Sequence, residues 1–306
     1  MVYGIIWHKD CERHQVPTQH PETPARITAI QDQLVAHGLD LFMPYTEASP
    51  ATIEQLERVH GVAYVKRMFS LAESGEEHWL DPDTFFTQGT LTAALCAAGA
   101  CVEAVDLVMK SNVRHQFCLV RPPGHHAESD SAGGFCIFNN IAVGAAHALE
   151  TYGLERIAIV DFDAHHGNGT ESIFRYEPRI LLCTTFQHPF YPDRPFLSGN
   201  DHIVNVPLPA YTASGPFREA VTGHWLPALE AFRPQLVMVS AGFDGHTSDN
   251  MSQLMLTNED FAWVSGQLTG IADKYAGNRL VAVLEGGYNL DTLGGSVLAF
   301  LQEYWK

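Results

Sequence analysis

The chain has 306 residues, of which 46% are hydrophobic, and its 35 Asp and Glu against 18 Lys and Arg give a formal net charge of -17. This composition allows a sizeable apolar core and argues against a nucleic-acid-binding surface, which needs clustered Lys and Arg. No stretch approaches the roughly 20 apolar residues of a membrane span, and the N-terminus lacks the basic n-region of a signal peptide.

The six cysteines form no C-x-x-C pair, and four of them lie in apolar runs. We interpret them as buried free thiols in a reducing compartment. Together with the absence of a membrane span and of a signal peptide, this predicts a cytoplasmic protein. From the compact length we also expect a bacterial source.

Strand-like and helix-like segments alternate along the whole chain. Apolar runs rich in β-branched residues predict strands at 3–7, 116–120, 156–162, 180–186, 202–206, 236–241 and 280–284. Helical spacing predicts helices at 88–110, 139–151, 215–232 and 258–275, the last with Asn258 as its N-cap and Gly277 after its end. Near-continuous apolar runs are typical of parallel strands that are covered on both faces. We therefore predict an α/β fold with a central parallel sheet flanked by helices, in a single domain over residues 1–306.

Polar motifs follow four of the predicted strands, where folds of this class bind their ligands. In chain order they are Arg121-Pro-Pro-Gly-His125-His126, Asp161-Phe-Asp163-Ala-His165-His166-Gly-Asn168, Ala241-Gly-Phe-Asp244 and Glu285-Gly-Gly-Tyr288. Because the carboxyl ends of parallel strands meet at one edge of a sheet, we expect the four motifs to converge there.

Asp163, His165 and Asp244 offer two carboxylates and an imidazole to one cation. Asp163 and His165 are two residues apart, so a strand end directs both side chains to the same side. A single Asp-x-His is more often a pair of polar loop residues, but a third ligand at an equivalent strand end favours a metal site. Three protein ligands leave one position open, as in catalytic zinc sites, and the mixed oxygen and nitrogen set also fits Fe(II) or Co(II).

His125 and His126 follow a stiff Pro-Pro-Gly turn at the same edge. One imidazole could take a proton from water and one could return a proton to a leaving amine. Each needs a partner that fixes its ring and tautomer, and Asp161 and Asn168 are the candidates. Tyr288 could donate its hydroxyl proton to a developing oxyanion.

These motifs, in this order, resemble those of the histone deacetylase superfamily, which also contains acetylpolyamine aminohydrolases and bacterial histone deacetylase-like amidohydrolases. The resemblance runs from His20-Pro-Glu-Thr-Pro-Ala-Arg26 to Tyr288. It implies the arginase-deacetylase fold, with a parallel sheet of about eight strands between helices. Asn168 stands where some subfamilies carry Asp, so the chain is most similar to class II and the bacterial branch.

The resemblance implies two kinds of cation. Asp163, His165 and Asp244 match the ligands of zinc. A structural potassium ion is expected near Asp161, the carbonyl groups of Asp163 and His165, and Thr184 and Thr185.

The resemblance also implies catalytic roles. His125 and His126 match the tandem histidines, with the second as general base, and Tyr288 matches the tyrosine that polarises the scissile carbonyl. Asp161 matches the aspartate that pairs with the first histidine, and Asn168 is the expected partner of the second.

Substrate contacts are expected from further residues. Phe135, after Gly134, matches one aromatic wall of an acyl-lysine tunnel, and Tyr191 is the candidate for the facing wall. Gly287 would let the backbone pass close to a ligand. Asp81 and Asp83 could lie at the entrance and bind a substrate backbone or a cation, and a surface-loop role is the alternative.

The resemblance implies zinc-dependent hydrolysis of acyl-lysine amides in proteins or peptides. Acetylated polyamines are the alternative substrates. A protein that binds acyl-lysine with only weak catalysis is a remote alternative function, because such a binder is expected to lack His126 or Tyr288. A two-manganese arginase relative would need another carboxylate two residues after His165, where the chain has Gly167. The sequence does not give the oligomeric state.

Overall fold

The computed structural model describes residues 2–305 and contains one eight-stranded sheet in the order β2-β1-β5-β10-β9-β6-β7-β8. Every neighbouring pair in this sheet is parallel. The strands are β1 (Val2–Trp7), β2 (Tyr45–Glu47), β5 (Val113–Leu119), β6 (Ile157–Asp161), β7 (Ile180–Gln187), β8 (Ile203–Leu208), β9 (Leu236–Ala241) and β10 (Leu280–Leu284). A small antiparallel pair, β3 (His78–Trp79) and β4 (Phe85–Phe86), lies apart from it. The predicted parallel α/β fold is confirmed.

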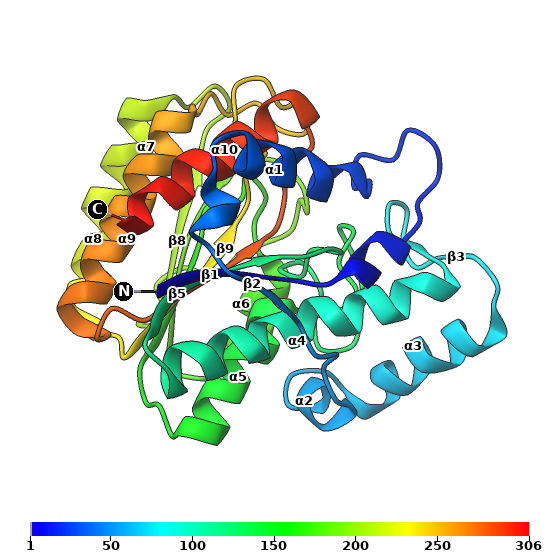
Figure 1. The fold of residues 1–306 in the computed structure, drawn as a ribbon. Coiled ribbons are helices and arrows are strands. Elements are labelled where there is room, and N and C mark those ends of the chain that lie inside the picture. Colours follow the sequence, from blue (N-terminus) through cyan, green and yellow to red (C-terminus); the bar gives the residue numbers. More distant parts are fainter. Residues whose placement is uncertain (1, 306) are drawn as a thin grey trace.

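Helices cover both faces of the sheet (Figure 1). One layer contains α1 (Ala25–Ala36), α7 (Ser214–Ala220), α8 (Leu226–Phe232), α9 (Asn258–Tyr275) and α10 (Leu290–Gln302). The other contains α2 (Ile53–Glu57), α3 (Val62–Ser74), α4 (Gln88–Lys110), α5 (Asn140–Tyr152) and α6 (Asn168–Phe174). Short 3₁₀ segments lie at Lys9–Arg13, Leu39–Leu41 and Glu303–Trp305.

Successive strand residues contribute to opposite layers of the core. In β6, Ile157 and Ile159 pack on the α4 and α5 side, whereas Ala158 and Val160 pack on the α9 and α10 side. Because side chains alternate along a strand, a strand with helices on both faces must be apolar at every position. This explains the continuous apolar runs of the sequence.

Helix α4 corrects one expectation from the sequence. By length and composition α4 could cross a membrane, so the expectation that the chain has no sufficiently long apolar stretch was wrong. However, 72% of its apolar window is buried within the protein. Its Ala-rich surface packs against α5 and the sheet, so we interpret α4 as a core helix.

Three local predictions differ from the structure. Thr257, not Asn258, caps α9, because its hydroxyl and the Asp260 carboxylate form a reciprocal capping box. The helix expected at 215–232 is interrupted by a π-helical turn, Val221–Trp225, between α7 and α8. Strand β2 was not predicted, because it has only three residues, Tyr45–Glu47, and therefore carries no apolar run.

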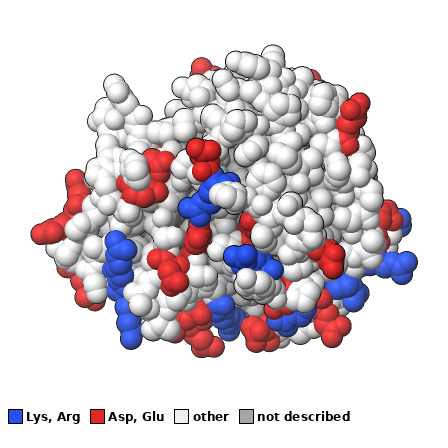
Figure 2. Space-filling model, turned by 180° about the vertical axis from the view of Figure 1, so that it is seen from behind, with Lys and Arg blue, Asp and Glu red and all other residues white. Residues whose placement is uncertain are grey.

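The face of the molecule opposite to that in Figure 1 carries intermingled acidic and basic side chains along its lower part, and its upper part is largely uncharged (Figure 2). No continuous basic surface is visible on this face.

Candidate functional site

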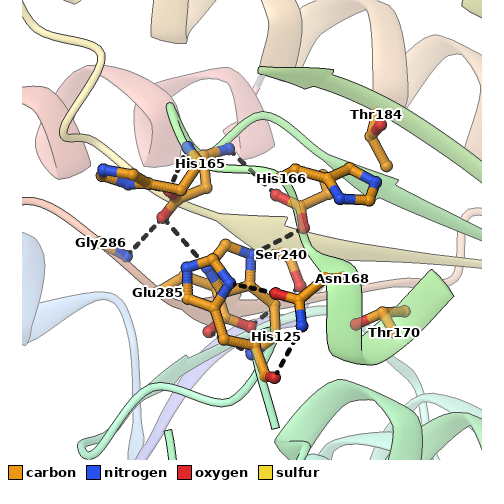
Figure 3. A network of polar contacts seen from close by, with 12 residues as sticks. His125, His165, His166, Asn168, Thr170, Thr184, Ser240, Glu285 and Gly286 are labelled. Carbon is orange, nitrogen blue, oxygen red and sulfur yellow. Dashed lines mark hydrogen bonds and ion pairs between the residues drawn. The ribbon is translucent and has the colours of Figure 1, made fainter. Parts of the chain in front are cut away.

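The four predicted motifs meet at one edge of the sheet, because β5, β10, β9 and β6 are neighbours in it. His125 and His126 follow β5, Tyr288 follows β10, Asp244 follows β9, and Asp163 and His165 follow β6. Figure 3 shows His125, His165, Asn168 and Glu285 within one network of polar contacts.

Asp163, His165 and Asp244 form a buried cluster that could hold a metal ion. The Nδ1 atom of His165 lies 3.0 Å from Oδ1 of Asp163 and 2.9 Å from Oδ2 of Asp244. The Nε2 atom of the same ring lies 3.0 Å from the carbonyl oxygen of Met251, to which it donates. This second contact leaves Nδ1 as the lone-pair nitrogen that faces the two carboxylates, as a metal ligand requires.

The backbone lies very close to the carboxylates of Asp163 and Asp244. The amide of Gly286 donates to Oδ2 of Asp163 at 2.8 Å, and that of Ala164 donates to Oδ1 of Asp244 at 2.9 Å. A Cβ atom at Gly286 would lie 2.3 Å from Oδ2 of Asp244 and 2.5 Å from Oδ2 of Asp163. A Cβ at Gly242 would lie 2.1 Å from the same oxygen of Asp163. Glycine at both positions therefore leaves the carboxylates room for a cation.

The ionisation of the cluster suits a cation rather than an empty pocket. Burial and the adjacent Asp163 carboxylate raise the pKa of Asp244 to about 7. Burial opposes a charge on His165, but Asp244 and Asp163 outweigh it and raise its pKa well above the usual value. The metal-free cluster thus retains protons that a divalent ion would displace. The donor set of two carboxylates and one imidazole fits zinc or Fe(II).

The tandem histidines have different partners. Nδ1 of His125 lies 2.9 Å from Oδ2 of Asp161, and Nδ1 of His126 lies 2.8 Å from Oδ1 of Asn168. Burial lowers the pKa of His125, but Asp161, Asp163 and Glu285 outweigh it and raise the pKa to about 10. Burial and the charge of His125 hold the pKa of His126 well below its usual value. A charged His125 therefore lies beside a neutral His126.

Glu285 holds the histidine turn, the segment that carries His125 and His126, through hydrogen bonds to its backbone. Its Oε2 atom accepts from the amides of Gly124 at 2.7 Å and His125 at 3.1 Å, and its Oε1 atom accepts from the Ser240 hydroxyl at 2.9 Å. Burial raises the pKa of Glu285 to about 7. These bonds tie the loop after β5 to strands β9 and β10, so the two histidines and the metal cluster keep one relative position.

Tyr288 is held at the other side of the cluster. Its amide donates to Oδ2 of Asp249 at 2.6 Å, and the guanidinium of Arg26 lies 4.8 Å from its ring centroid. Arg26 also donates to the carbonyls of Gly287, at 2.6 Å, and of Glu285. Burial raises the pKa of Tyr288 well above 10, so its hydroxyl stays protonated and can donate. Gly287, predicted as a substrate contact, does not line the cavity, and its carbonyl accepts a hydrogen bond from Arg26.

A cavity of about 250 Å³ opens onto these groups. Its lining residues are Asp83, His126, Gly134, Phe135, His165, Phe190, Tyr191, Asn250, Met251 and Tyr288. The rings of Phe135 and Tyr288 pack edge to face with their centroids 5.6 Å apart, and those of Tyr191 and His126 pack in the same way with their centroids 5.1 Å apart. The predicted aromatic walls therefore both lie in the cavity, as do Asp83 and Gly134.

The residues expected around potassium are also near one another. Asp161 and Thr184 are partners in the register of β6 and β7, and both are buried. The Thr184 hydroxyl donates to Oδ1 of Asn205 at 2.7 Å, which leaves its oxygen lone pairs as acceptors or ligands. Thr185 is the next residue of β7 and is paired with Val206 of β8.

Several residues of the site were not found from the sequence. Phe190, Asn250 and Met251 line the cavity from loops, and no pattern marked them. Glu22 and Arg26, four residues apart in His20-Pro-Glu-Thr-Pro-Ala-Arg26, are completely buried, and that spacing was the available signal. Glu22 also accepts from the Arg121 guanidinium at 2.8 and 2.7 Å, which anchors the start of the histidine turn.

Comparison with known proteins agrees with this geometry. Residues 20–304 match the family described as histone deacetylase domain. A probable deacetylase of Archaeoglobus fulgidus is 36% identical over 299 residues, which cover 95% of this chain and 82% of that protein. Polyamine deacetylase HDAC10 of Mus musculus is 34% identical over 326 residues, which cover 98% of this chain and 47% of that protein. The crystal structure of the HDA15 HD domain matches with a TM-score of 0.92 and 30% sequence identity, and the match covers 99% of this chain and 89% of that one.

Proposed function

Because this chain belongs to the histone deacetylase family, we propose that it is a zinc-dependent hydrolase of acyl-lysine amides in proteins or peptides, releasing a carboxylate and a free amine. The observation that carries the proposal is the buried Asp163, His165 and Asp244 cluster beside an aromatic-walled cavity into which His126 and Tyr288 both project. An extended lysine side chain fits a narrow apolar cavity that ends in polar groups.

Asp163, His165 and Asp244 would hold the ion, and the cradle of Gly242 and Gly286 supports that assignment. When bound there, zinc supplies a Lewis acid for the acyl carbonyl and lowers the pKa of water. Iron(II) is the alternative occupant.

The protein groups then divide the proton transfers. His126, with its Nδ1 engaged by Asn168, offers Nε2 to the proton of the attacking water and later returns that proton to the leaving amine. His125 keeps its proton and adds positive charge near the reacting carbonyl. The Tyr288 hydroxyl donates to the oxyanion as it forms.

Acetylated polyamines are a second candidate class of substrate, favoured by one observation. Asp83 is the carboxylate residue in the cavity lining, so it could receive a distal ammonium group. Burial and the neighbouring Asp81 raise its pKa to about 6, which still leaves it largely ionised at pH 7.5 and above. Asp83 could equally accept backbone amides of a peptide.

We test the two substrate classes with acetyl-lysine peptides, longer acyl-lysine peptides and acetylspermidine on the zinc-loaded protein and on Asp83→Asn. An Asn side chain still accepts hydrogen bonds from peptide amides but does not attract an ammonium group. We expect the peptides to be the better substrates and to lose little kcat/KM in the variant. Preference for acetylspermidine, with a loss of about tenfold or more in Asp83→Asn, would favour the polyamine function. If the zinc-loaded protein hydrolysed none of these substrates, both hydrolase functions would be excluded, and binding of acyl-lysine without catalysis would be the remaining function.

We further propose a structural potassium ion beside Asp161, the carbonyls of Asp163 and His165, Thr184 and Thr185. The register of β6 and β7 and the free lone pairs of Thr184 support it. A higher melting temperature in KCl than in equimolar tetramethylammonium chloride would be expected, and equal values would contradict it.

We also propose a cytoplasmic location. The six cysteines are free and buried in the structure, which suits a reducing compartment.

A further inference from the structure

The amide of Asn168 has a defined orientation. Its Nδ2 atom lies 2.9 Å from Oε1 of Glu128 and 3.4 Å from the carbonyl oxygen of His126. Both of these oxygens can only accept, so the nitrogen of the amide must point toward them. The amide oxygen is therefore the atom that faces Nδ1 of His126 at 2.8 Å.

This orientation fixes the tautomer of His126. An amide oxygen accepts a hydrogen bond, so Nδ1 of the neutral ring must carry the hydrogen. The unprotonated nitrogen is then Nε2, which is the one left to act as a base. If the Asn168 amide were reversed, its nitrogen would donate to Nδ1 and the ring hydrogen would move to Nε2, where it blocks proton acceptance.

Glu128 is the stronger of the two groups that select the orientation. Its hydrogen bond with Asn168 is charge-assisted and 0.5 Å shorter than the bond to the His126 carbonyl, from the two distances of 2.9 and 3.4 Å. Glu128 is only partly buried, with 24% of its side chain exposed, and it forms an ion pair with Arg194 of the loop between β7 and β8. Glu128, Asn168 and Arg194 all line a second cavity, of about 340 Å³, and Asn168 contacts His126, which lines the substrate cavity.

We propose that Glu128 is a positioning residue that, through Asn168, keeps His126 in the tautomer with a free Nε2. The inference rests on the proposed role of His126 as base. Glu128 does not line the substrate cavity, so its effect on His126 needs a residue that contacts both, and Asn168 is such a residue.

A purely structural role is the competing explanation. Glu128 could serve only to anchor the β7–β8 loop, which carries Tyr191 of the cavity wall, through its ion pair with Arg194. The two explanations differ in what replaces Glu128. In Glu128→Ala, water from the second cavity would contact Asn168, and water selects neither orientation of the amide because it both donates and accepts. Only the longer contact with the His126 carbonyl, at 3.4 Å, would still favour the original orientation.

The test measures the tautomer of His126 directly, by 15N NMR of the histidine-labelled, zinc-loaded protein, with His126→Gln to assign the signals. We expect hydrogen on Nδ1 in the unmodified protein and a substantial population with hydrogen on Nε2 in Glu128→Ala, with kcat lowered about tenfold. Glu128→Met keeps the length without a strong acceptor, and it repeats the test if the alanine variant does not fold.

Asn168→Asp provides the decisive second change, because a carboxylate has no reversed orientation. We expect Glu128→Ala/Asn168→Asp to return the hydrogen to Nδ1 and to have a higher kcat than Glu128→Ala. With Glu128 retained, Asn168→Asp places two carboxylates against each other. Removal of Glu128 should therefore raise kcat in the Asn168→Asp variant and lower it in the unmodified protein.

Arg194→Ala is the matched control, because it removes the loop anchor and leaves the Glu128–Asn168 bond. We expect it to keep the hydrogen of His126 on Nδ1. The proposal is overturned if Glu128→Ala also keeps the hydrogen on Nδ1, or if Arg194→Ala shifts the tautomer as much as Glu128→Ala does. Since the NMR readout does not depend on turnover, a protein that hydrolyses no acyl-lysine would refute the proposed function and leave the tautomer result standing.

Discussion

His125 and Asp161 form a buried pair in which the imidazole Nδ1 lies 2.9 Å from a carboxylate oxygen, and both side chains are almost fully shielded from solvent. The adjacent His126 has a neutral amide in the equivalent place. At His125 burial is outweighed by the nearby carboxylates, which raise its pKa, whereas burial and the charge of His125 lower the pKa of His126. The pKa values of two neighbouring residues of the same type are therefore shifted in opposite directions.

We predict that Asp161→Asn moves the alkaline limb of the kcat profile to lower pH. The pKa of His125 is raised to about 10, so its charge is present below that pH and is lost as pH rises through it. Without the carboxylate, the pKa falls toward the usual value near 6.5, and the charge is lost earlier. Turnover measured from pH 6 to 10 checks this shift. Asp106→Asn, which breaks a His–Asp pair at 2.7 Å on another part of the protein, is the control and should leave the profile unchanged.

Zinc affinity should increase with pH between about 6 and 8. The raised pKa values of Asp244, to about 7, and of His165 mean that the metal-free cluster holds protons at low pH, and these must leave when the ion binds. Competition with a chelator at pH 6, 7 and 8 measures the affinity. The gain in melting temperature on adding zinc should likewise be larger at pH 8 than at pH 6.

Asp244→Ala should lose zinc while remaining folded, because one of three ligands is removed and the carboxylate of Asp163 alone cannot replace it. Metal analysis after dialysis measures the content. A full metal complement in this variant would exclude Asp244 from the site.

Tyr288→Phe should keep zinc and lower kcat by about a hundredfold or more, which is the usual cost of one oxyanion donor. The ring remains to pack on Phe135 and Arg26, so the cavity should keep its shape. Metal analysis and steady-state kinetics check the two parts separately. Near-normal turnover would show that the hydroxyl has no catalytic role.

Gly286→Ala should abolish zinc binding, because the new Cβ would fall 2.3 Å from Asp244 and 2.5 Å from Asp163. Gly270→Ala is the matched control, since that exposed position in α9 has open space for a Cβ. We expect Gly270→Ala to bind zinc normally and to be slightly more stable, by about 0.5–1 kcal/mol. Normal zinc content in Gly286→Ala would mean that the loop after β10 moves freely.

The alternation of apolar runs and helical patterns was sufficient to predict the parallel sheet and its two helical layers. Seven of the eight strands of the sheet were visible as apolar runs: six lie inside the sheet with a neighbour on each side, and the seventh, the edge strand β8, is still six residues long. The edge strand β2 has only three residues and carries no such signal. The order of strands could not be predicted from the runs alone, because pairing depends on contacts between segments distant in sequence.

The metal ligands and the tandem histidines could be predicted because their chemistry is carried by short motifs at strand ends. The supporting groups were harder to find. Glu22, Arg26 and Arg121 act through backbone carbonyls and one another across up to 261 residues, and a charged residue destined for the interior looks like a surface residue in sequence. Glu128 was overlooked for a related reason, since its importance follows from the orientation of another side chain.

Strand β10 lies between β5 and β9, near the middle of the sheet, although it is the last of the described strands to leave the ribosome. It carries Gly286 and Tyr288 at its end, and Glu285, which braces the histidine turn. A nascent chain that has not yet released these residues can therefore neither complete its sheet nor place Gly286, Tyr288 and Glu285 beside the metal cluster and the histidine turn. The protein should gain catalytic competence in a single late step of synthesis, with no partly active precursor.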